Sequence, residues 1–196
     1  MLNLAINGCG RIGRHVLKIA REMEGVRVVG ANDLTDAATL AHLLRHDTVY
    51  RGYPRHVSVQ GTALVIDGVE IPVFAEKDPS KLPWKTLGVD VVLECTGRFT
   101  DRVGAETHLV AGAKHVVISA PAKSDDIPTF VLGVNDEVMT GEESIVSNAS
   151  CTTNSLAPVM AILQHAFGVK KSLMTTIHSY TASQVLQDAP AKDLRE

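Results

Sequence analysis

Cys151 is the residue whose surroundings point most clearly to chemistry. It lies in the run SNASCTTN (residues 147–154), between a predicted buried strand and a predicted helix. Because a helix N-terminus stabilises a thiolate over a thiol, this position predicts a lowered pKa and a nucleophile. The alternative is a structural cysteine, with serine and threonine acting as helix caps. Cys9 and Cys95 fit that second description, and we assign neither of them a chemical role.

A nucleophilic thiol needs a base, and His178 is the histidine that we expect to provide it. His178 lies in a predicted strand from Ser172 to Tyr180, which follows a predicted helix from about Thr152 to Phe167. A helix and one returning strand would bring His178 back to Cys151. The imidazole would then stabilise an ion pair with the thiol and later accept a proton from the reacting hydroxyl. Position alone leaves His178 one candidate among eight histidines.

A glycine-rich loop at residues 8–13 follows a predicted strand and opens a predicted helix. Its sequence, GCGRIG, fits the pattern GxGxxG. In this pattern Gly8 permits a tight turn, Gly10 lets a pyrophosphate approach the backbone, and Gly13 lets the helix pack closely on the sheet. The helix N-terminus adds N–H donors for the anion. Asp33, at the end of the next strand, would accept both ribose hydroxyls and repel a 2′-phosphate, which favours NAD over NADP.

The same residues allow a simpler interpretation, in which the glycines only turn the chain and Asp33 caps a helix predicted from Asp36 to Arg45. The combination of strand, helix and acidic residue favours the cofactor site. Thr96 and Ser119 add small polar side chains at the ends of two later strands, the edge where parallel sheets bind ligands. The three cysteines lack CxxC spacing, so we expect no disulfide framework and no metal site.

The elements that must position these residues alternate between apolar, β-branched runs and amphipathic segments of helix length, which is typical of βαβ units. We therefore expect an α/β fold, with a Rossmann-type doubly wound, mainly parallel sheet followed by an incomplete α+β catalytic domain. The NAD-binding domain is predicted to span residues 1–150, and residues 151–196 to begin the catalytic domain. An antiparallel ribbon around Asp67-Gly68 should interrupt the parallel pattern, with Pro72 on an edge strand.

The composition is that of a globular chain and limits its partners. The 196 residues are 45% hydrophobic and carry a formal net charge of -3. A net negative charge gives no positive electrostatic field that would attract the phosphate backbone of a nucleic acid, so we expect no specific nucleic-acid partner. No apolar stretch is long enough to cross a membrane, and the first strand runs into the glycine loop without a cleavage site. We therefore expect no membrane partner and a cytoplasmic location.

Together these motifs resemble the phosphorylating, NAD-dependent glyceraldehyde-3-phosphate dehydrogenase family, and the resemblance covers essentially the whole chain. The most specific motif is SCTTN at residues 150–154, because it follows a dinucleotide fold. The other shared motifs are NGCGRIGR (7–14), ND (32–33), CTG (95–97), SAP (119–121) and HSYTASQ (178–184).

By this resemblance NAD is the cofactor, and glyceraldehyde 3-phosphate and inorganic phosphate are the substrates. Cys151 attacks the aldehyde to give a hemithioacetal, hydride passes to NAD, and phosphate releases the thioester as 1,3-bisphosphoglycerate, with His178 activating the thiol. The resemblance also implies a homotetramer. The binding residues that it implies are Ser150 and Thr152 at one phosphate site, Thr181 at the other, and Gly8, Gly10, Arg11, Ile12, Gly13, Asp33, Lys77, Thr96 and Ser119 at the cofactor.

In this family several parts of the active site follow the stretch that resembles residues 1–196. They include an arginine that clamps substrate phosphate and an asparagine that holds nicotinamide, so we expect an interrupted chain with weak turnover on its own. Two alternatives stay open: a noncatalytic NAD-binding or assembly fragment, and an erythrose-4-phosphate dehydrogenase, which uses the same cysteine and fold. Ala189-Pro190 departs from the family pattern, because NAD-using members often carry a larger apolar residue before the proline. This departure weakens the preference for NAD that Asp33 indicates.

Overall fold

The computed structural model describes residues 1–181 and Gln184, in two compact units, Met1–Ala161 and Ile162–Glu196. Ala189-Pro190 and most of the C-terminal end of the predicted catalytic domain lie outside the described residues. The domain boundary near residue 150 stays a prediction. Among the described residues, no helix is both long and apolar enough to cross a membrane.

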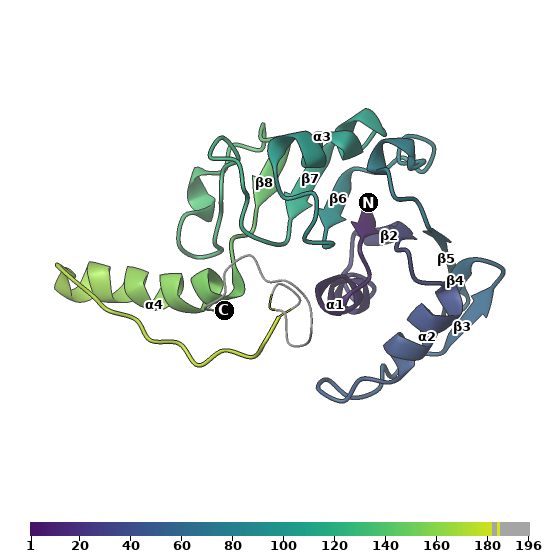
Figure 1. Cartoon of the computed structure of the whole chain (residues 1–196), viewed down its shortest axis with the longest axis horizontal. Helices are drawn as coiled ribbons and strands as arrows, with labels where there is room; N and C mark the ends of the chain where they lie inside the picture. Colours follow the sequence, from purple (N-terminus) through teal and green to yellow (C-terminus); the bar gives the residue numbers. More distant parts are fainter. Residues whose placement is uncertain (182–183, 185–196) are drawn as a thin grey trace. The chain divides into compact units, whose positions relative to one another are not determined.

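The first unit alternates strands and helices much as the hydrophobic pattern predicts (Figure 1). The strands are β1 (Leu2–Asn7), β2 (Val26–Asn32), β3 (Val57–Gln60), β4 (Ala63–Ile66), β5 (Val69–Phe74), β6 (Val91–Glu94), β7 (His115–Ile118) and β8 (Ile145–Ser147). The helices are α1 (Arg11–Ala20), α2 (Ala37–Arg45), α3 (Arg102–Val110) and α4 (Cys151–Phe167), with short 3-10 turns η1 (Pro79–Lys81) and η2 (Asp136–Val138). Aspartates at the N-caps of α2 and α3 accept backbone N–H groups of the first turn, which fixes where these helices begin.

All the strands of the first unit form one sheet, in the order β3-β4-β5-β2-β1-β6-β7-β8. β1 pairs in parallel with β2 on one side and with β6 on the other, and β7 and β8 continue the parallel part. The chain therefore leaves β1 in one direction and later returns to its other side. Parallel sheets bind ligands at the carboxyl ends of the strands beside such a reversal, which here is the end of β1. The predicted Rossmann-type, mainly parallel sheet is confirmed.

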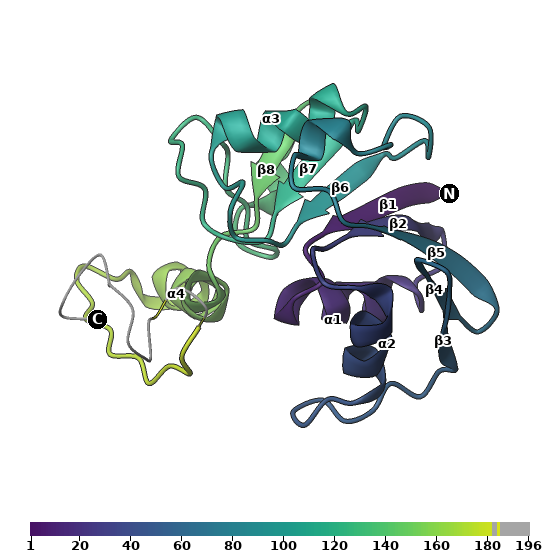
Figure 2. The ribbon, with the colours of Figure 1, turned by 45° about the vertical axis from the view of Figure 1, so that its right-hand side comes forward.

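Helices cover both faces of the sheet in this unit (Figures 1 and 2), with α1 and α2 on one side and α3 on the other. Along β1, Leu4 and Ile6 pack with α1 and α2 in one apolar cluster, whereas Ala5 packs in a second cluster with Trp84 and Val92. A strand buried on both faces needs apolar residues at successive positions, so the strand sequences read as continuous apolar runs.

The antiparallel ribbon predicted around Asp67-Gly68 consists of β3, β4 and β5. Asp67 (φ 48°) and Gly68 (φ 78°) form the two-residue turn between β4 and β5. The prediction that Pro72 marks an edge strand is wrong, because β5 lies between β4 and β2. The sheet tolerates this proline because β5 pairs with β2 only at Val73 and Phe74, after the residue that lacks an N–H group.

The second unit contains the end of α4 and the segment that follows it. Helix α4 begins at Cys151, and Pro158, whose nitrogen carries no hydrogen to donate, lies inside the helix. The predicted strand from Ser172 to Tyr180 is wrong, because residues 169–181 form neither helix nor strand. A strand needs a neighbour to pair with its N–H and C=O groups, and none of the described strands pairs with this segment.

Candidate functional site

The loop between β1 and α1 contains three glycines, and the fold itself requires glycine at two of these positions. Gly8 has a φ of +92°, and a Cβ on it would lie 2.8 Å from backbone atoms of Cys95 and Thr96. A Cβ on Gly13 would lie 1.9 Å from the carbonyl oxygen of Gly8. These two glycines therefore allow the loop to contact the end of β6, and α1 to contact the loop.

Gly10 lacks a side chain for a different reason. Its φ is -69°, and a Cβ on it would meet no atom within 4 Å. Gly10 is exposed at the N-cap of α1, and Ile12 in the first helical turn is half exposed. Neither the backbone conformation nor the packing requires glycine at position 10. A ligand that approaches the backbone would require it, and the N-terminus of α1 suits an anionic ligand such as a pyrophosphate.

Asp33 is held against the same loop by backbone donors. Its Oδ2 accepts the N–H of Cys9 at 2.6 Å, and its Oδ1 accepts the N–H of Thr35 at 2.8 Å. The helix cap that the simpler interpretation gave to Asp33 belongs to Asp36, which accepts the N–H of Thr39. Each carboxylate oxygen has two lone pairs, so the half-buried Asp33 keeps acceptor capacity for a ribose at the carboxyl end of β2.

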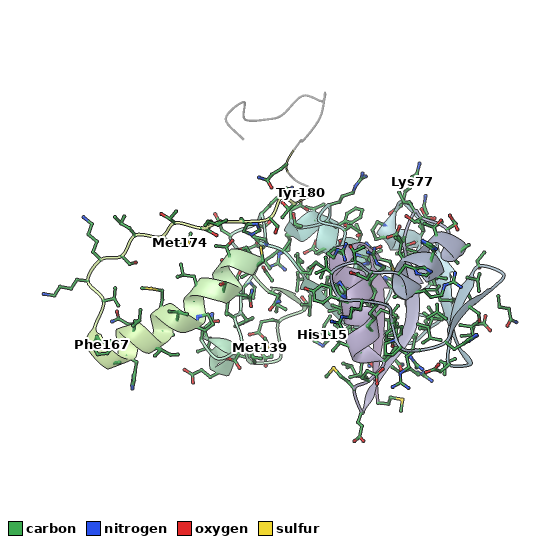
Figure 3. The ribbon with its side chains drawn as sticks, turned by 90° about the horizontal axis from the view of Figure 1, so that it is seen from below. Lys77, His115, Met139, Phe167, Met174 and Tyr180 are labelled. Atoms are coloured by element: carbon green, nitrogen blue, oxygen red, sulfur yellow. The ribbon has the colours of Figure 1, made fainter. Side chains whose placement is uncertain are left out.

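Two basic residues flank this edge of the sheet. Arg11, the first residue of α1, pairs with Asp47 over 2.7 Å between Nη1 and Oδ2. Lys77 follows β5 and projects from the surface of the first unit (Figure 3). The preceding residue, Glu76, exchanges backbone hydrogen bonds of 2.8 and 2.9 Å with the side chain of Asn32. This contact keeps the Lys77 loop beside the end of β2.

Thr96 and Ser119 follow β6 and β7 at the same edge. The N–H of Thr96 donates to the Glu94 carboxylate at 2.7 Å, and the N–H of Ser119 donates to the Glu94 carbonyl oxygen at 3.0 Å. Both residues are half-buried. The order β2-β1-β6-β7 thus brings Asp33, the glycine loop, Thr96 and Ser119 together along one edge of the sheet.

Cys151 is exposed and is the first residue of α4. Ser150 caps this helix, because its Oγ accepts the N–H of Thr153 at 2.9 Å. Thr152 is half-buried in the first turn. Before the cap, Ala149 adopts a φ of +58°, a left-handed conformation that is rare outside glycine and costs energy. Such strained residues cluster at functional sites, where they fix the direction of a reactive side chain.

Burial distinguishes the other two cysteines from Cys151. Burial, together with the nearby Asp33 carboxylate, raises the pKa of the Cys9 thiol to about 12. It also raises the pKa of the Cys95 thiol to about 11, although a hydrogen bond with Ser119 acts in the opposite direction. Both groups are protonated thiols at neutral pH and therefore poor nucleophiles, which agrees with assigning them no chemical role.

His178 and Thr181 belong to the second unit and lie in the exposed segment after α4. The Nδ1 atom of His178 lies 2.6 Å from the carbonyl oxygen of Ser179, and the N–H of Thr181 donates to the Gln184 side chain at 2.9 Å. Cys151 belongs to the first unit. The pairing of His178 with Cys151 therefore stays a prediction.

The sequence patterns did not indicate a group of buried polar side chains beneath the cofactor edge. Asn7, Asn32, Glu94 and His108 are all at least 96% buried, and they are linked by hydrogen bonds. One signal was available, because Glu94 ends an apolar strand and an ionisable side chain in such a strand must find partners. Its partners come from distant parts of the chain, which local patterns do not reveal.

Comparison with known proteins gives matches along most of the chain. Residues 2–102 match the glyceraldehyde 3-phosphate dehydrogenase NAD binding domain, and residues 150–196 match the C-terminal domain of the same family. The chain is 53% identical over 197 residues to glyceraldehyde-3-phosphate dehydrogenase of Thermotoga maritima, which covers 100% of this chain and 59% of that protein.

Two further relatives give the same result. Glyceraldehyde-3-phosphate dehydrogenase 1 of Bacillus cereus is 53% identical over 100% of this chain and 58% of its own length. The glyceraldehyde-3-phosphate dehydrogenase of Geobacillus stearothermophilus is 53% identical over 99% of this chain and 58% of its own length. The chain thus spans less than two thirds of these relatives, and it belongs to the glyceraldehyde 3-phosphate dehydrogenase family, whose NAD binding domain it carries.

Proposed function

We propose that the complete protein is an NAD-dependent, phosphorylating glyceraldehyde-3-phosphate dehydrogenase of glycolysis, with Cys151 as its nucleophile. The observation that carries this proposal is an exposed thiol on the first residue of a 17-residue helix, directly after a serine cap. The family supports the choice of substrate. The three relatives described above are named for the triose phosphate, which favours it over erythrose 4-phosphate and favours an enzyme over a noncatalytic fragment.

The cofactor site of this proposal is the carboxyl edge of the sheet. The pyrophosphate would lie at the N-terminus of α1, over Gly8, Gly10 and Gly13 and beside Arg11 and Ile12. Asp33 would accept the hydroxyls of the adenosine ribose. The remaining proposed contacts are Lys77, Thr96 and Ser119. When bound, NAD supplies the acceptor for hydride.

In the proposed reaction the Cys151 thiolate attacks the aldehyde carbon, and a C–S bond forms as the carbonyl π electrons move to oxygen. His178, protonated when it took the proton of the Cys151 thiol, would return that proton to the alkoxide. The neutral imidazole would then take the proton back from the hydroxyl while hydride leaves the same carbon, which gives a thioester. A phosphate oxygen then attacks the thioester carbonyl, the C–S bond breaks, and the thiolate leaves. Ser150 and Thr152 would bind one phosphate group and Thr181 the other.

The assembly and location that go with this proposal are a homotetramer in the cytoplasm. They rest on the resemblance to the family. Size-exclusion chromatography of the complete protein with light scattering would measure the mass of the assembly directly.

The proposal predicts that Cys151→Ser in the complete protein abolishes phosphate-dependent NAD reduction and leaves NAD binding intact. A hydroxyl cannot replace the thiolate, so we expect turnover to fall by at least about 10³-fold. The measurement is NADH absorbance with glyceraldehyde 3-phosphate, together with calorimetric titration of NAD. Ser155→Ala, on an exposed position of the same helix, is the control and should retain activity. Turnover by the Cys151 variant near the wild-type rate would refute the nucleophile assignment.

A further inference from the structure

The buried polar side chains beneath the cofactor edge form one connected chain of hydrogen bonds. It runs across the ends of three neighbouring strands, from Asn32 on β2 to Asn7 on β1 and Glu94 on β6, with N···O distances of 2.7 and 2.6 Å. It continues through His108 on α3, 3.0 Å from Glu94, to the indole of Trp84, 3.1 Å from His108. We name these five residues the strand-end network.

At the β2 end, backbone atoms of Glu76 determine which atom of each side chain in the network donates and which accepts. The Oδ1 atom of Asn32 accepts the N–H of Glu76, and its Nδ2 donates to the Glu76 carbonyl oxygen. With that orientation set, Asn32 must donate to Oδ1 of Asn7. Asn7 then has only its Nδ2 left for Glu94, so it donates to Oε2.

At the other end, the indole of Trp84 determines which nitrogen of His108 accepts a hydrogen bond. Trp84 Nε1–H is only a donor, so Nδ1 of His108 must be an unprotonated acceptor. The proton of a neutral His108 is then on Nε2, which donates to Oε2 of Glu94. The 3.4 Å approach between Asn7 Nδ2 and His108 Nε2 is consequently not a hydrogen bond, because both atoms donate to the same oxygen.

Glu94 is the common acceptor of the network, and it also holds the start of the next loop. Its Oε1 accepts the N–H of Thr96 at 2.7 Å and contacts the Thr96 hydroxyl. Three N–H donors, from β1, from α3 and from the loop after β6, therefore meet on the carboxyl group of Glu94, a residue that is 1% exposed. Buried polar groups that are fully paired in this way specify one arrangement of the elements that carry them.

Each strand that contributes to the network ends in residues of the proposed cofactor site. Asn7 directly precedes Gly8, Asn32 directly precedes Asp33, and Glu94 holds Thr96 by its backbone. We propose that Glu94 is a positioning residue for dinucleotide binding, which fixes these three strand ends relative to one another through Asn7, His108 and Thr96. This inference rests on the proposed function, because it concerns the same NAD site.

Glu94→Gln tests the proposal, because both carboxylate oxygens of Glu94 accept hydrogen bonds and an amide has only one oxygen. The NH₂ group of the glutamine would face either the Thr96 N–H or the N–H groups of Asn7 and His108, so that two donors would meet. His108 cannot relieve this by moving its proton to Nδ1, because Nδ1 accepts the indole N–H of Trp84. We expect NAD affinity to fall by about tenfold or more, because a buried donor then lacks its partner. The matched control is Glu106→Gln, the same change at an exposed position of α3.

Calorimetric titration of NAD into the complete protein, below the unfolding temperature of each variant, separates positioning from stability. A lower melting temperature with an unchanged dissociation constant for Glu94→Gln would overturn the positioning role. Failure of the complete wild-type protein to bind NAD would overturn the proposed function and this inference together. Binding by the wild type and equal binding by Glu94→Gln would overturn the inference alone.

A measurement on the wild type keeps the proposal testable if Glu94→Gln does not fold. Trp84 is the only tryptophan of the chain, so its indole N–H gives a single NMR resonance. The network predicts an Nε2–H tautomer for His108 and slower exchange of the indole proton when NAD is added, because coupling between sites is reciprocal. A protonated Nδ1 on His108, or indole exchange that NAD does not change, would overturn the proposal.

Discussion

The carboxylate of Asp33 joins two parts of the cofactor edge. By accepting the N–H groups of Cys9 and Thr35, it connects the glycine loop to the end of β2. The same contacts orient its two oxygens, and in the proposed cofactor site their remaining lone pairs and their negative charge would face the nucleotide. The preference for NAD over NADP that we propose for Asp33 therefore depends on one negative charge, which backbone N–H groups hold in a fixed position.

Asp33→Asn should reduce the discrimination against NADP. The amide nearly keeps the shape of the side chain but removes the charge that repels a 2′-phosphate, so the ratio of the NADP and NAD dissociation constants should fall by on the order of tenfold. Titration of both nucleotides measures the ratio. Asp36→Asn is the control, because asparagine also caps a helix well. An unchanged ratio for the Asp33 variant would argue against the ribose role.

The ion pair between Arg11 and Asp47 joins the start of α1 to the loop after α2. Asp47 also accepts the N–H groups of Val49 and Tyr50, and its side chain is 1% exposed. The Tyr50 N–H, with that of Val49 and the Arg11 guanidinium, lowers the pKa of Asp47 from 3.8 to about 2. This arrangement fixes the end of α2 beside the first turn of α1, the turn that we propose binds the pyrophosphate.

The lowered pKa of Asp47 predicts how the stability of this corner depends on pH. The folded carboxyl binds a proton more weakly than the unfolded one, so Asp47 stabilises the fold above about pH 4, and this stabilisation is lost as the pH falls towards about 2. The difference in unfolding free energy between wild type and Asp47→Asn should thus shrink as the pH is lowered. Urea unfolding at about pH 6, 4 and 3 measures it, with the exposed Asp125→Asn as control. A difference that stays constant over this range would contradict the assignment.

The elements of the first unit were predictable because their signals are local. Apolar runs mark the strands, Asp36 and Asp101 mark helix starts, and Asp67-Gly68 marks a hairpin turn. The strand-end network was not predictable, because Asn7 and Glu94 are 87 positions apart and only the sheet order makes them neighbours. The expected strand from Ser172 to Tyr180 failed for a related reason, since strand formation depends on a partner that the segment's own sequence does not specify.

For the molecule as a whole, we propose that the edge formed by β2, β1, β6 and β7 binds a dinucleotide whose pyrophosphate lies at the N-terminus of α1. Gly10 offers the sharpest test because a side chain fits there in the free protein. Aspartate is a good N-cap, so Gly10→Asp should leave the unfolding free energy unchanged or raise it by up to about 1 kcal/mol. Its carboxylate would occupy the place proposed for the pyrophosphate and repel it.

The deciding measurement is calorimetric titration of NAD into the complete protein and into its Gly10→Asp variant, with melting curves of both. We expect the wild type to bind NAD, and the variant to lose about 100-fold or more in affinity for NAD without a loss of stability. If the variant is equally stable and binds NAD as tightly as the wild type, the pyrophosphate does not bind at the N-terminus of α1.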